Sequence, residues 1–258
     1  MKLGLIGRGA IARYVSPVLK ARGHEIAAVL LRPERVNQEA ALEVGSVDDL
    51  PQDIEFMIDC AGHTALATYG PQLLERGMDV ITVSLGALAD PKIMGALEQT
   101  AAKGRSKLHL ASGAIGALDC LKAARIGRLH TVAYTGRKPP KGWIGSPAES
   151  KINLGALSQT AHTHFEGSAR EAALSYPKNA NVAAAVALAG LGFDDTQVRL
   201  IADPTIRQNI HEITASGEFG DFHFQISGNS LPDNPRSSAL AAMSVVAKLD
   251  QVIGGISL

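Results

Sequence analysis

A glycine-rich segment at residues 7–12, with the sequence GRGAIA, constrains the fold more than any other feature of the chain. It follows a short apolar run, Lys2–Ile6, which predicts a strand, and it opens an amphipathic stretch, Ile11–Arg22, which predicts a helix. The pattern G-x-G-x-x-A between a strand and a helix is typical of the first βαβ unit of a dinucleotide-binding sheet. The segment therefore predicts a parallel sheet flanked by helices, starting at the N-terminus.

The small residues of this segment indicate how a dinucleotide would bind. Gly7 permits the tight turn, and Gly9 lets the backbone approach a pyrophosphate. The start of the helix offers free amides and the positive end of its dipole to the same anion. We therefore expect contacts to NAD or NADP from Gly7, Gly9, Ala10 and Ile11. The alternative is a tight turn that binds no ligand.

The rest of the first half alternates short apolar runs with amphipathic stretches. Strands are expected at Glu25–Leu31, Ile54–Asp59, Met78–Val83 and Leu108–Ala111, and helices at Ala65–Arg76 and Pro91–Lys103. This alternation predicts an α/β fold whose N-terminal part is a Rossmann domain with a parallel sheet.

The second half has a different pattern. Strands are expected at Arg128–Arg137, Gln197–Ala202, Ile206–Ser216 and Asp221–Gly228, the last two joined as a hairpin by the turn 217–220. Helices are expected at Phe165–Tyr176, Asn181–Leu191 and Ser237–Val252. These elements predict a smaller α+β domain.

The end of the second predicted strand bears on the choice of cofactor. An acidic residue that holds the adenosine ribose is expected about 20 positions after the glycines, and Arg32 stands there instead. A guanidinium can bind the 2′-phosphate of NADP, and the sequence places no carboxylate ready to repel it. We therefore expect NADP to be accepted. The alternative is a solvated arginine beside an NAD site.

Small residues follow two other strands at their carboxyl ends, where open α/β sheets bind ligands. Cys60 and Ala61 follow one strand, and the segment 84–87 (SLGA) follows the next. We expect these residues to lie near the nicotinamide half of the cofactor. Ordinary turns between strand and helix are the alternative.

Composition and charge limit the partners. Lys and Arg together number 25, as do Asp and Glu, so no field of one sign would attract nucleic acid or an anionic membrane, and a small-molecule substrate is favoured. Cys60 and Cys120 lack metal-type spacing, and no metal is expected. The longest uncharged apolar stretch, Asn179–Phe193, is too short to span a bilayer, and the N-terminus has no signal-peptide core. We expect a cytoplasmic protein.

From residue 111 onward the sequence resembles the L-aspartate dehydrogenase family. The similar segments keep the family's order: 111–119 (ASGAIGALD), 135–140 (TGRKPP), 165–172 (FEGSAREA), 176–184 (YPKNANVAA), 209–213 (NIHEI), 216–220 (SGEFG) and 234–242 (NPRSSALAA). The resemblance implies NAD(P)-dependent oxidation of L-aspartate to iminoaspartate, and the reverse amination. The product either feeds NAD biosynthesis or hydrolyses to oxaloacetate and ammonia.

The resemblance also implies residue roles and an organisation into domains. Ala114 and Asn181 match the family's NAD-contacting residues, and His211 matches its active-site histidine. Residues 1–112 and 236–258 would form the dinucleotide-binding domain, because the last helix is expected to return to it. Residues 113–235 would bind substrate and form a homodimer.

Some residues of the second half suit this chemistry independently. Oxidising an amino acid needs a base for the amino-group proton and cations for two carboxylates. Lys138, in a proline-rich loop that is a candidate lid, or Lys178 could hold a carboxylate, with Asn179 also at the substrate. Solvated lysines and a helix-capping asparagine are the alternatives.

His211 is the candidate acid/base group, because it alternates with Asn209 and Ile213 on one strand face. A structural histidine is the alternative. His162 and His164 lack the matching ligands of a metal site.

Other functions remain open at this point. The chain could be another Rossmann oxidoreductase, such as a homoserine dehydrogenase-like, dihydrodipicolinate reductase-like or sugar dehydrogenase-like enzyme. It could also be a non-catalytic NAD(P)-sensing protein. Sequence alone leaves open the NAD/NADP preference, the physiological direction, the residues that clamp the carboxylates and the oligomeric state.

Overall fold

The computed structural model describes residues 1–177, 179–231 and 234–256. The chain divides into two compact units. Unit 1 comprises Met1–Ala87, Pro91–Ala111 and Ala241–Leu258, and unit 2 comprises Leu88–Asp90 and Ser112–Leu240. The sequence predicts these boundaries after residue 112 and before residue 236.

Unit 1 contains a six-stranded parallel sheet with the strand order β3-β2-β1-β4-β5-β6. The strands are β1 (Lys2–Ile6), β2 (Glu25–Leu30), β3 (Glu43–Val44), β4 (Phe56–Asp59), β5 (Asp79–Thr82) and β6 (Leu108–Leu110). The flanking helices are α1 (Ala10–Ala21), α2 (His63–Glu75), α3 (Pro91–Gly104) and α9 (Ala239–Ile253). The predicted Rossmann arrangement is confirmed; the short strand β3 was not foreseen.

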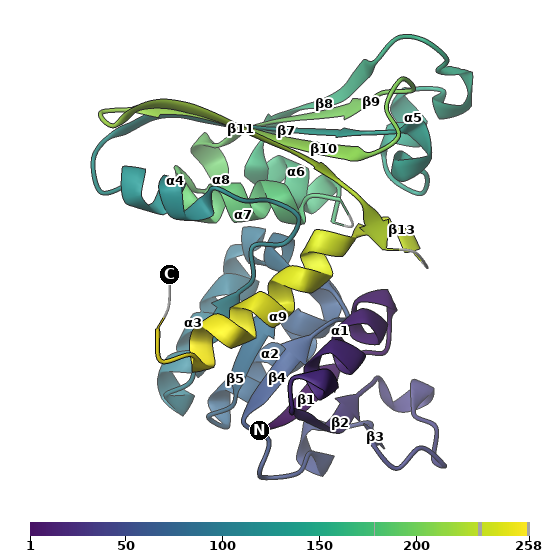
Figure 1. The fold of residues 1–258 in the computed structure, drawn as a ribbon, viewed down its shortest axis with the longest axis vertical. Helices are drawn as coiled ribbons and strands as arrows, with labels where there is room; N and C mark the ends of the chain where they lie inside the picture. Colours follow the sequence, from purple (N-terminus) through teal and green to yellow (C-terminus); the bar gives the residue numbers. More distant parts are fainter. Residues whose placement is uncertain (178, 232–233, 257–258) are drawn as a thin grey trace. The chain divides into compact units, whose positions relative to one another are not determined.

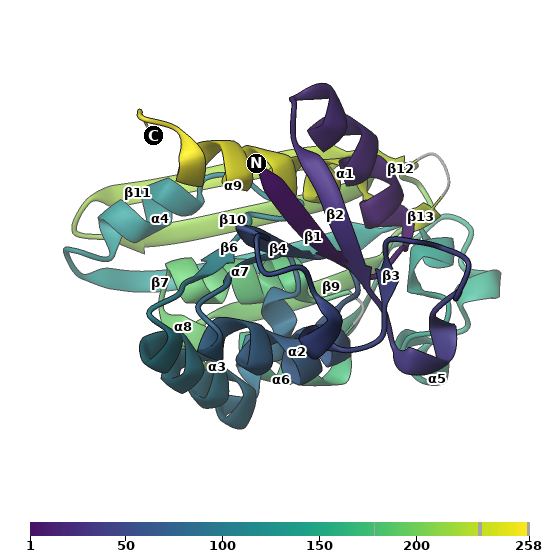
Figure 2. The ribbon, with the colours of Figure 1, turned by 90° about the horizontal axis from the view of Figure 1, so that it is seen from below.

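Helices cover both faces of this sheet. Both ribbon views place α1 and α9 on one face and α2 and α3 on the other (Figure 1, Figure 2). Leu3, Met57 and Ile81, from three neighbouring strands, are completely buried. A strand buried on both faces needs a continuous apolar run, which is why the sequence of these strands does not alternate.

Unit 2 contains a five-stranded mixed sheet with the strand order β11-β10-β7-β9-β8. The strands are β7 (Leu129–Lys138), β8 (His162–Ser168), β9 (Gln197–Ala202), β10 (Asn209–Gly217) and β11 (Gly220–Gly228). Only β7 and β9 of the pairs in this sheet run parallel. A separate two-stranded sheet joins β12 (Ser230–Leu231) to β13 (Asn234–Ser238).

Helices lie on one face of the five-stranded sheet (Figure 1). They are α4 (Leu118–Ala124), α6 (Ala169–Ser175), α7 (Asn181–Ala189) and α8 (Gly192–Asp195), and a short helix, α5 (Ala148–Lys151), follows the loop after β7. Nearly all of α7 is buried, which explains why its alanine-rich sequence is apolar on every side.

The structure corrects the helix predicted over Phe165–Tyr176. The chain stays in strand β8 until Ser168, and the helix α6 begins only at Ala169. Ser168 caps this helix in a capping box with Glu171, a signal of the form S-x-x-E that the sequence contained. His162 and His164, which precede the predicted helix and would lie in a loop before it, consequently lie in strand β8.

The hairpin agrees with expectation. Gly217 pairs with Gly220 across the turn between β10 and β11, and Gly220 has a φ of +108°, which suits glycine.

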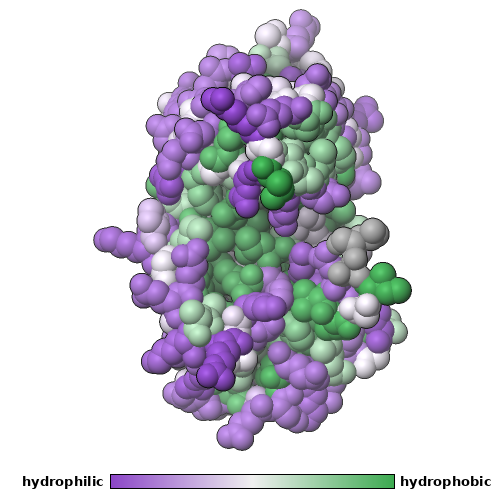
Figure 3. Space-filling view, turned by 90° about the vertical axis from the view of Figure 1, so that its left-hand side faces the viewer, coloured by the Kyte–Doolittle hydropathy of each residue, from purple (hydrophilic) through white to green (hydrophobic). Residues whose placement is uncertain are grey.

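In the face drawn in Figure 3, hydrophilic side chains occupy most of the outer surface, with hydrophobic ones between them. Within the described ranges, no helix combines the length and apolar character that crossing a membrane requires.

Candidate active site

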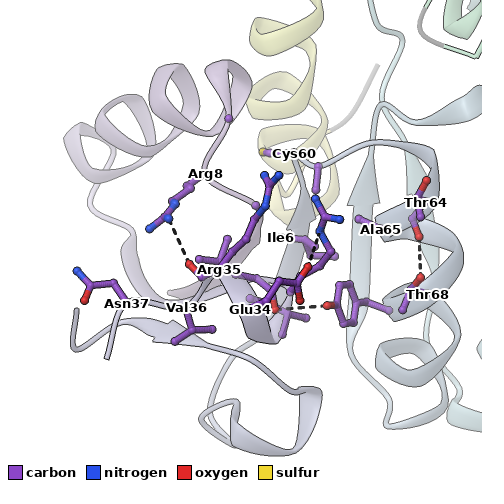
Figure 4. Close-up of a pocket in the computed structure, with 17 residues that line it drawn as sticks. Ile6, Arg8, Glu34, Arg35, Val36, Asn37, Cys60, Thr64, Ala65 and Thr68 are labelled. Carbon is purple, nitrogen blue, oxygen red and sulfur yellow. Dashed lines mark hydrogen bonds and ion pairs between the residues drawn. The ribbon is translucent and has the colours of Figure 1, made fainter. Parts of the chain in front are cut away.

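A pocket of about 920 Å³ lies in unit 1 at the carboxyl ends of its strands. It is lined by the turn between β1 and α1, by the segment that follows β2, and by the turn between β4 and α2 (Figure 4). The predicted cofactor residues that line it are Gly7, Gly9, Arg32, Cys60 and Ala61. The strand order brings these turns together, because β1 lies between β2 and β4.

The glycines leave room that a side chain would fill. Gly7 has a φ of +87°, and a Cβ added there would lie 2.8 Å from Cβ of Ala61. A Cβ on Gly9 would meet only the carbonyl oxygen of Cys60, at 3.8 Å, so the space beside Gly9 is open. Gly9 is also the N-cap of α1, and no side chain caps its first amides. This cradle fits a pyrophosphate.

Other residues expected at the cofactor lie outside the lining of this pocket. Ala10 and Ile11 form the first turn of α1, where they can offer only backbone amides. Residues 84–87 are buried and do not line the pocket.

Charged residues surround the adenosine end expected for this pocket. Arg8 donates to a carboxylate oxygen of Glu43 (2.5 Å) and to the carbonyl of Arg35 (3.2 Å). Arg32 Nε lies 3.6 Å from Oε1 of Glu34. In the described part of the chain, the Arg35 guanidinium has no hydrogen-bond or ion-pair partner. Arg8, Arg32 and Arg35 all line the pocket, so its wall carries three guanidinium groups.

Glu34 corrects the expectation that no carboxylate stands near Arg32. The turn Pro33–Arg35 is a short 3₁₀ helix, and it folds Glu34 back into the pocket wall. A carboxylate at this position can accept hydrogen bonds from the ribose hydroxyls. The pocket therefore contains groups suited to NAD as well as to NADP.

Asp59 ties together two strand ends beneath the pocket. Its buried carboxylate accepts hydrogen bonds from the amides of Ala61 (2.9 Å) and Gly62 (3.3 Å) and from the hydroxyls of Thr82 (2.7 Å) and Ser84 (2.5 Å). Burial raises the pKa of this carboxyl, and the four donors oppose that shift. Asp59 thus holds the Cys60–Ala61 turn in position.

A second group of polar residues lies in unit 2, where β7 and β10 are neighbours. His211 pairs with Gly136, and Lys138 lies two residues further along β7, so both side chains are on the same face of the sheet. Lys138 Nζ donates to Oδ1 of Asn179 (2.9 Å) and lies 5.0 Å from the centroid of the Trp143 ring. Burial lowers the pKa of Lys138 to about 8. No described carboxylate pairs with it.

His211 is buried, with 3% of its surface exposed. Burial, and to a lesser degree the charge of Lys138, lowers the pKa of this imidazole to about 3, so it is neutral at physiological pH. Its Nδ1 lies 2.8 Å from the hydroxyl of Tyr134. Its Nε2 has no hydrogen-bond partner in the described structure. The ring can therefore exchange a proton or a hydrogen bond with a ligand at Nε2.

Comparison with known proteins follows the same division. Residues 119–252 match the family model described as aspartate dehydrogenase, C-terminal, and residues 5–111 match the NAD binding domain of homoserine dehydrogenase. An L-aspartate dehydrogenase of Ruegeria pomeroyi is 52% identical, with 97% of this chain and 92% of the relative covered. One of Cupriavidus necator is 44% identical over the full length of both chains. The chain belongs to the L-aspartate dehydrogenase family.

The solved structures agree with this assignment. The crystal structure of aspartate dehydrogenase from Thermotoga maritima superposes with a TM-score of 0.80 at 25% identity, covering 100% of this chain and 99% of that one. An amine dehydrogenase from Mycobacterium smegmatis, at 13% identity and a TM-score of 0.56, shares the fold. The resemblance to L-aspartate dehydrogenases seen in the sequence is confirmed.

The two family positions for NAD contact lie in unit 2. Ala114 is buried in the irregular segment before α4. Asn181 is the first residue of α7, whose N-cap is Ala180 without a side-chain cap, so neither Asn179 nor Asn181 is the N-cap. Lys178 lies outside the described residues.

The loop after β7 is anchored at Trp143. The indole is completely buried and donates from Nε1 to the carbonyl of Ile201 (3.0 Å). A lid function for this loop stays a prediction, and the indole ties Trp143 to strand β9. His164 is also buried, with Nδ1 3.1 Å from the Tyr176 hydroxyl. Across the described residues, no three His, Cys, Asp or Glu side chains group as metal ligands would.

Sequence reasoning missed several residues of the site. Arg8 is the variable position inside the glycine pattern, and Arg35 lies one turn beyond Arg32. Tyr134 stands two residues before Gly136 on the face of β7 that carries Lys138, so strand alternation contained the signal.

Proposed function

We propose that the protein oxidises L-aspartate to iminoaspartate with NAD or NADP, and catalyses the reverse amination. The identity of 52% and 44% to two L-aspartate dehydrogenases, over nearly the whole chain, supports this reaction. The geometric observation that carries it is the pair Lys138 and His211 on one face of the unit 2 sheet: a buried cation without a described carboxylate partner beside a neutral imidazole. A cation of this kind is suited to a substrate carboxylate.

The pocket of unit 1 would hold the dinucleotide. Gly7 and Gly9, with the first amides of α1 at Ala10 and Ile11, would bind the pyrophosphate. Cys60 and Ala61 line the same pocket. When bound, the nicotinamide supplies the hydride acceptor for oxidation and the hydride donor for amination. Ala114 and Asn181 are proposed cofactor contacts on the strength of the family resemblance alone.

The residues of unit 2 would bind and deprotonate the substrate. Lys138 would hold one carboxylate of L-aspartate. The Asn179 side chain, which accepts a hydrogen bond from Lys138 Nζ, would orient the lysine and also contact the substrate. With its own proton on Nδ1, His211 would take a proton from the substrate nitrogen at Nε2 as the Cα–H bond breaks and its electron pair leaves as hydride. The product is the imine, which water hydrolyses to oxaloacetate and ammonia.

We also propose acceptance of NADP, a homodimer, a cytoplasmic location and a place in the supply of NAD biosynthesis. Arg8, Arg32 and Arg35 in the wall of the unit 1 pocket support the first. The two free thiols of Cys60 and Cys120 suit a reducing compartment. The family resemblance supports the dimer and the metabolic role, and sedimentation analysis of the purified protein tests the dimer.

An assay of oxidation with NAD and NADP tests the reaction. L-aspartate should be preferred to L-asparagine, L-alanine and L-homoserine, because losing one carboxylate leaves its cationic partner unpaired. The cost is roughly 2–5 kcal/mol, or about 30-fold and more in kcat/KM. L-asparagine is the matched control, since it keeps the shape and loses the charge. Equal efficiency with L-alanine would exclude a dicarboxylate pocket, and no turnover with any amino acid would favour a sensing protein.

A further inference from the structure

Tyr134 lies on the same face of β7 as Gly136 and Lys138, because strand residues two apart point the same way. Gly136 is the residue directly opposite His211 on β10. The Tyr134 side chain passes over Gly136, and its hydroxyl lies 2.8 Å from Nδ1 of His211. The two rings are nearly parallel, at 16°, with centroids 6.0 Å apart. The hydroxyl thus bonds Nδ1 and leaves Nε2, which has no partner in the described structure, available to a ligand.

The direction of this hydrogen bond follows from burial. Tyr134 has 1% of its surface exposed, and burial raises the pKa of its phenol, so the hydroxyl keeps its proton. His211 Nδ1 is the one hydrogen-bond partner of that hydroxyl in the described structure. If Nδ1 carried the ring proton, the phenol O–H would be buried without an acceptor, which is costly. If the phenol donates, both groups are satisfied.

We propose that Tyr134 is a positioning residue for His211: its phenol donates to Nδ1 and holds the resting imidazole with its proton on Nε2. Its bearing on catalysis rests on the proposed function, in which His211 acts on L-aspartate. In this tautomer the unpaired Nε2–H offers a hydrogen bond to an oxygen of the substrate, such as a carboxylate oxygen. Taking a proton at Nε2 requires the other tautomer, in which the phenol oxygen accepts from Nδ1–H.

Gly136 is the second part of this arrangement. A Cβ added there would lie 2.6 Å from the hydroxyl oxygen of Tyr134 and 3.1 Å from its Cζ, closer than packed atoms tolerate. Leu200 crowds the same point, with Cδ2 at 3.3 Å. Any side chain at this position would displace the tyrosine hydroxyl from Nδ1. Gly136 therefore provides the space through which Tyr134 reaches His211.

The tautomer of His211 is directly measurable by long-range proton–nitrogen NMR of the free protein carrying isotopically labelled histidine. The chain has eight histidines, and the signals of His211 are those lost in His211→Gln. We expect the wild-type ring to carry its proton on Nε2 alone. In Tyr134→Phe, which keeps the ring and loses the hydroxyl, the tautomer with the proton on Nδ1 should become populated. Gly136→Ala should have the same effect.

A matched control exists in the same unit. Tyr176 is equally buried, and its hydroxyl lies 3.1 Å from Nδ1 of the buried His164. Tyr176→Phe removes the same group from an equivalent pair and should leave the His211 signals unchanged. Thermal unfolding of each variant reports whether the fold is retained.

Activity gives a second measurement. Tyr134→Phe should lower kcat/KM for L-aspartate about 5- to 10-fold, the effect of one hydrogen bond, because the imidazolium formed when Nε2 takes the proton loses the phenol oxygen that accepts from Nδ1–H. The KM for the dinucleotide should stay within about twofold of wild type. A wild-type ring with its proton on Nδ1, or unchanged tautomer populations in Tyr134→Phe, would overturn the proposal even if L-aspartate is oxidised. Failure to oxidise L-aspartate would instead refute the proposed function and leave the tautomer result standing.

Discussion

Burial decides the charge of single residues in unit 2. Lys138 and His211 are both nearly inaccessible, and desolvation lowers the pKa of each cationic form, to about 8 and about 3. The lysine is still mostly protonated at neutral pH, whereas the histidine is neutral. One face of the sheet therefore presents a cation and an uncharged hydrogen-bonding group side by side.

The pKa of Lys138 predicts a pH dependence of substrate binding. Lys138 can pair with a carboxylate only while protonated, so the KM for L-aspartate should rise as pH increases through about 8. Lys138→Met should raise the KM at neutral pH and remove this dependence, as steady-state kinetics across the range would show. Lys141→Met is the control, because that lysine is exposed and lies three residues beyond Lys138, in the loop after β7. A KM of wild-type size in Lys138→Met would refute the clamp.

The same pKa predicts an effect on stability. The folded-state pKa of Lys138 lies below the ordinary value of 10.5, so between about 8 and 10.5 the unfolded chain binds more protons. The contribution of this group to stability therefore increases as pH rises through that window. Chemical unfolding of Lys138→Met should lack this contribution.

His211 is best tested by a substitution that keeps a partner for Tyr134. Alanine would leave the buried phenol unpaired and so lower stability together with activity. His211→Gln retains a polar group and should reduce kcat by roughly 10²–10⁴-fold, the contribution of a positioned acid/base group. The melting temperature and the Kd for NADP should stay close to wild type. More than about a tenth of the wild-type turnover would contradict the catalytic role.

Among the elements of unit 1, the turn after β4 depends on a residue of the strand itself. Asp59 joins the amides of that turn to hydroxyls at the end of β5. The wall of the pocket at Cys60 and Ala61 is thus held by hydrogen bonds beneath it, and the neighbouring strands supply the donors.

Asp59→Asn should weaken this turn, because an amide nitrogen cannot accept from the donors that now share the second carboxylate oxygen. The free energy of unfolding should fall by about 1–3 kcal/mol, and the Kd for the dinucleotide should rise. Denaturant unfolding and fluorescence titration measure the two. Asp79→Asn is the control: Asp79 also bonds a neighbouring strand, through His109, but does not line the pocket. An unchanged Kd in Asp59→Asn would show that the turn does not need Asp59.

The whole molecule combines balanced charge with a local excess of arginine in one pocket. The effect of those arginines is therefore confined to the ligand that enters the pocket. Any ligand that binds only the folded chain stabilises it by mass action, by about 2.7 kcal/mol at 100 times its Kd. Thermal unfolding thus reports cofactor choice without requiring catalysis.

The kcat/KM with NADP should be at least comparable to that with NAD, and Arg32→Asp should make NAD the better cofactor. At 100 times Kd either cofactor should raise the melting temperature by roughly 5–10 °C. Because the Arg32 side chain is exposed, Arg32→Asp should leave the melting temperature without ligand unchanged. At a fixed ligand concentration, the rise in melting temperature caused by NADP should become smaller relative to the rise caused by NAD. Glu34→Gln is the complementary variant and should favour NADP. An unchanged ratio in Arg32→Asp would place the 2′-phosphate elsewhere.

The sequence by itself determined the parallel sheet, the glycine turn at residues 7–9 and the presence of His211 and Lys138 in a second domain. These features are local: strand runs, the turn and the start of α1 each lie within a few adjacent residues. Local patterning failed where a turn reversed the chain or a strand gave way to a helix. It therefore missed Glu34 in the pocket wall and the strand β8 before α6.

Only the tertiary structure decided which polar groups meet. Tyr134 and His211 are 77 residues apart, and Lys138 and Asn179 are 41 apart. Strand order and register set the first pair, and the position of Asn179 beside the end of β7 sets the second. No sequence pattern specifies either, because a register shift of one residue would turn His211 to the opposite face of the sheet. Burial, which makes His211 neutral and lowers the pKa of Lys138, exists only once the helices cover that face.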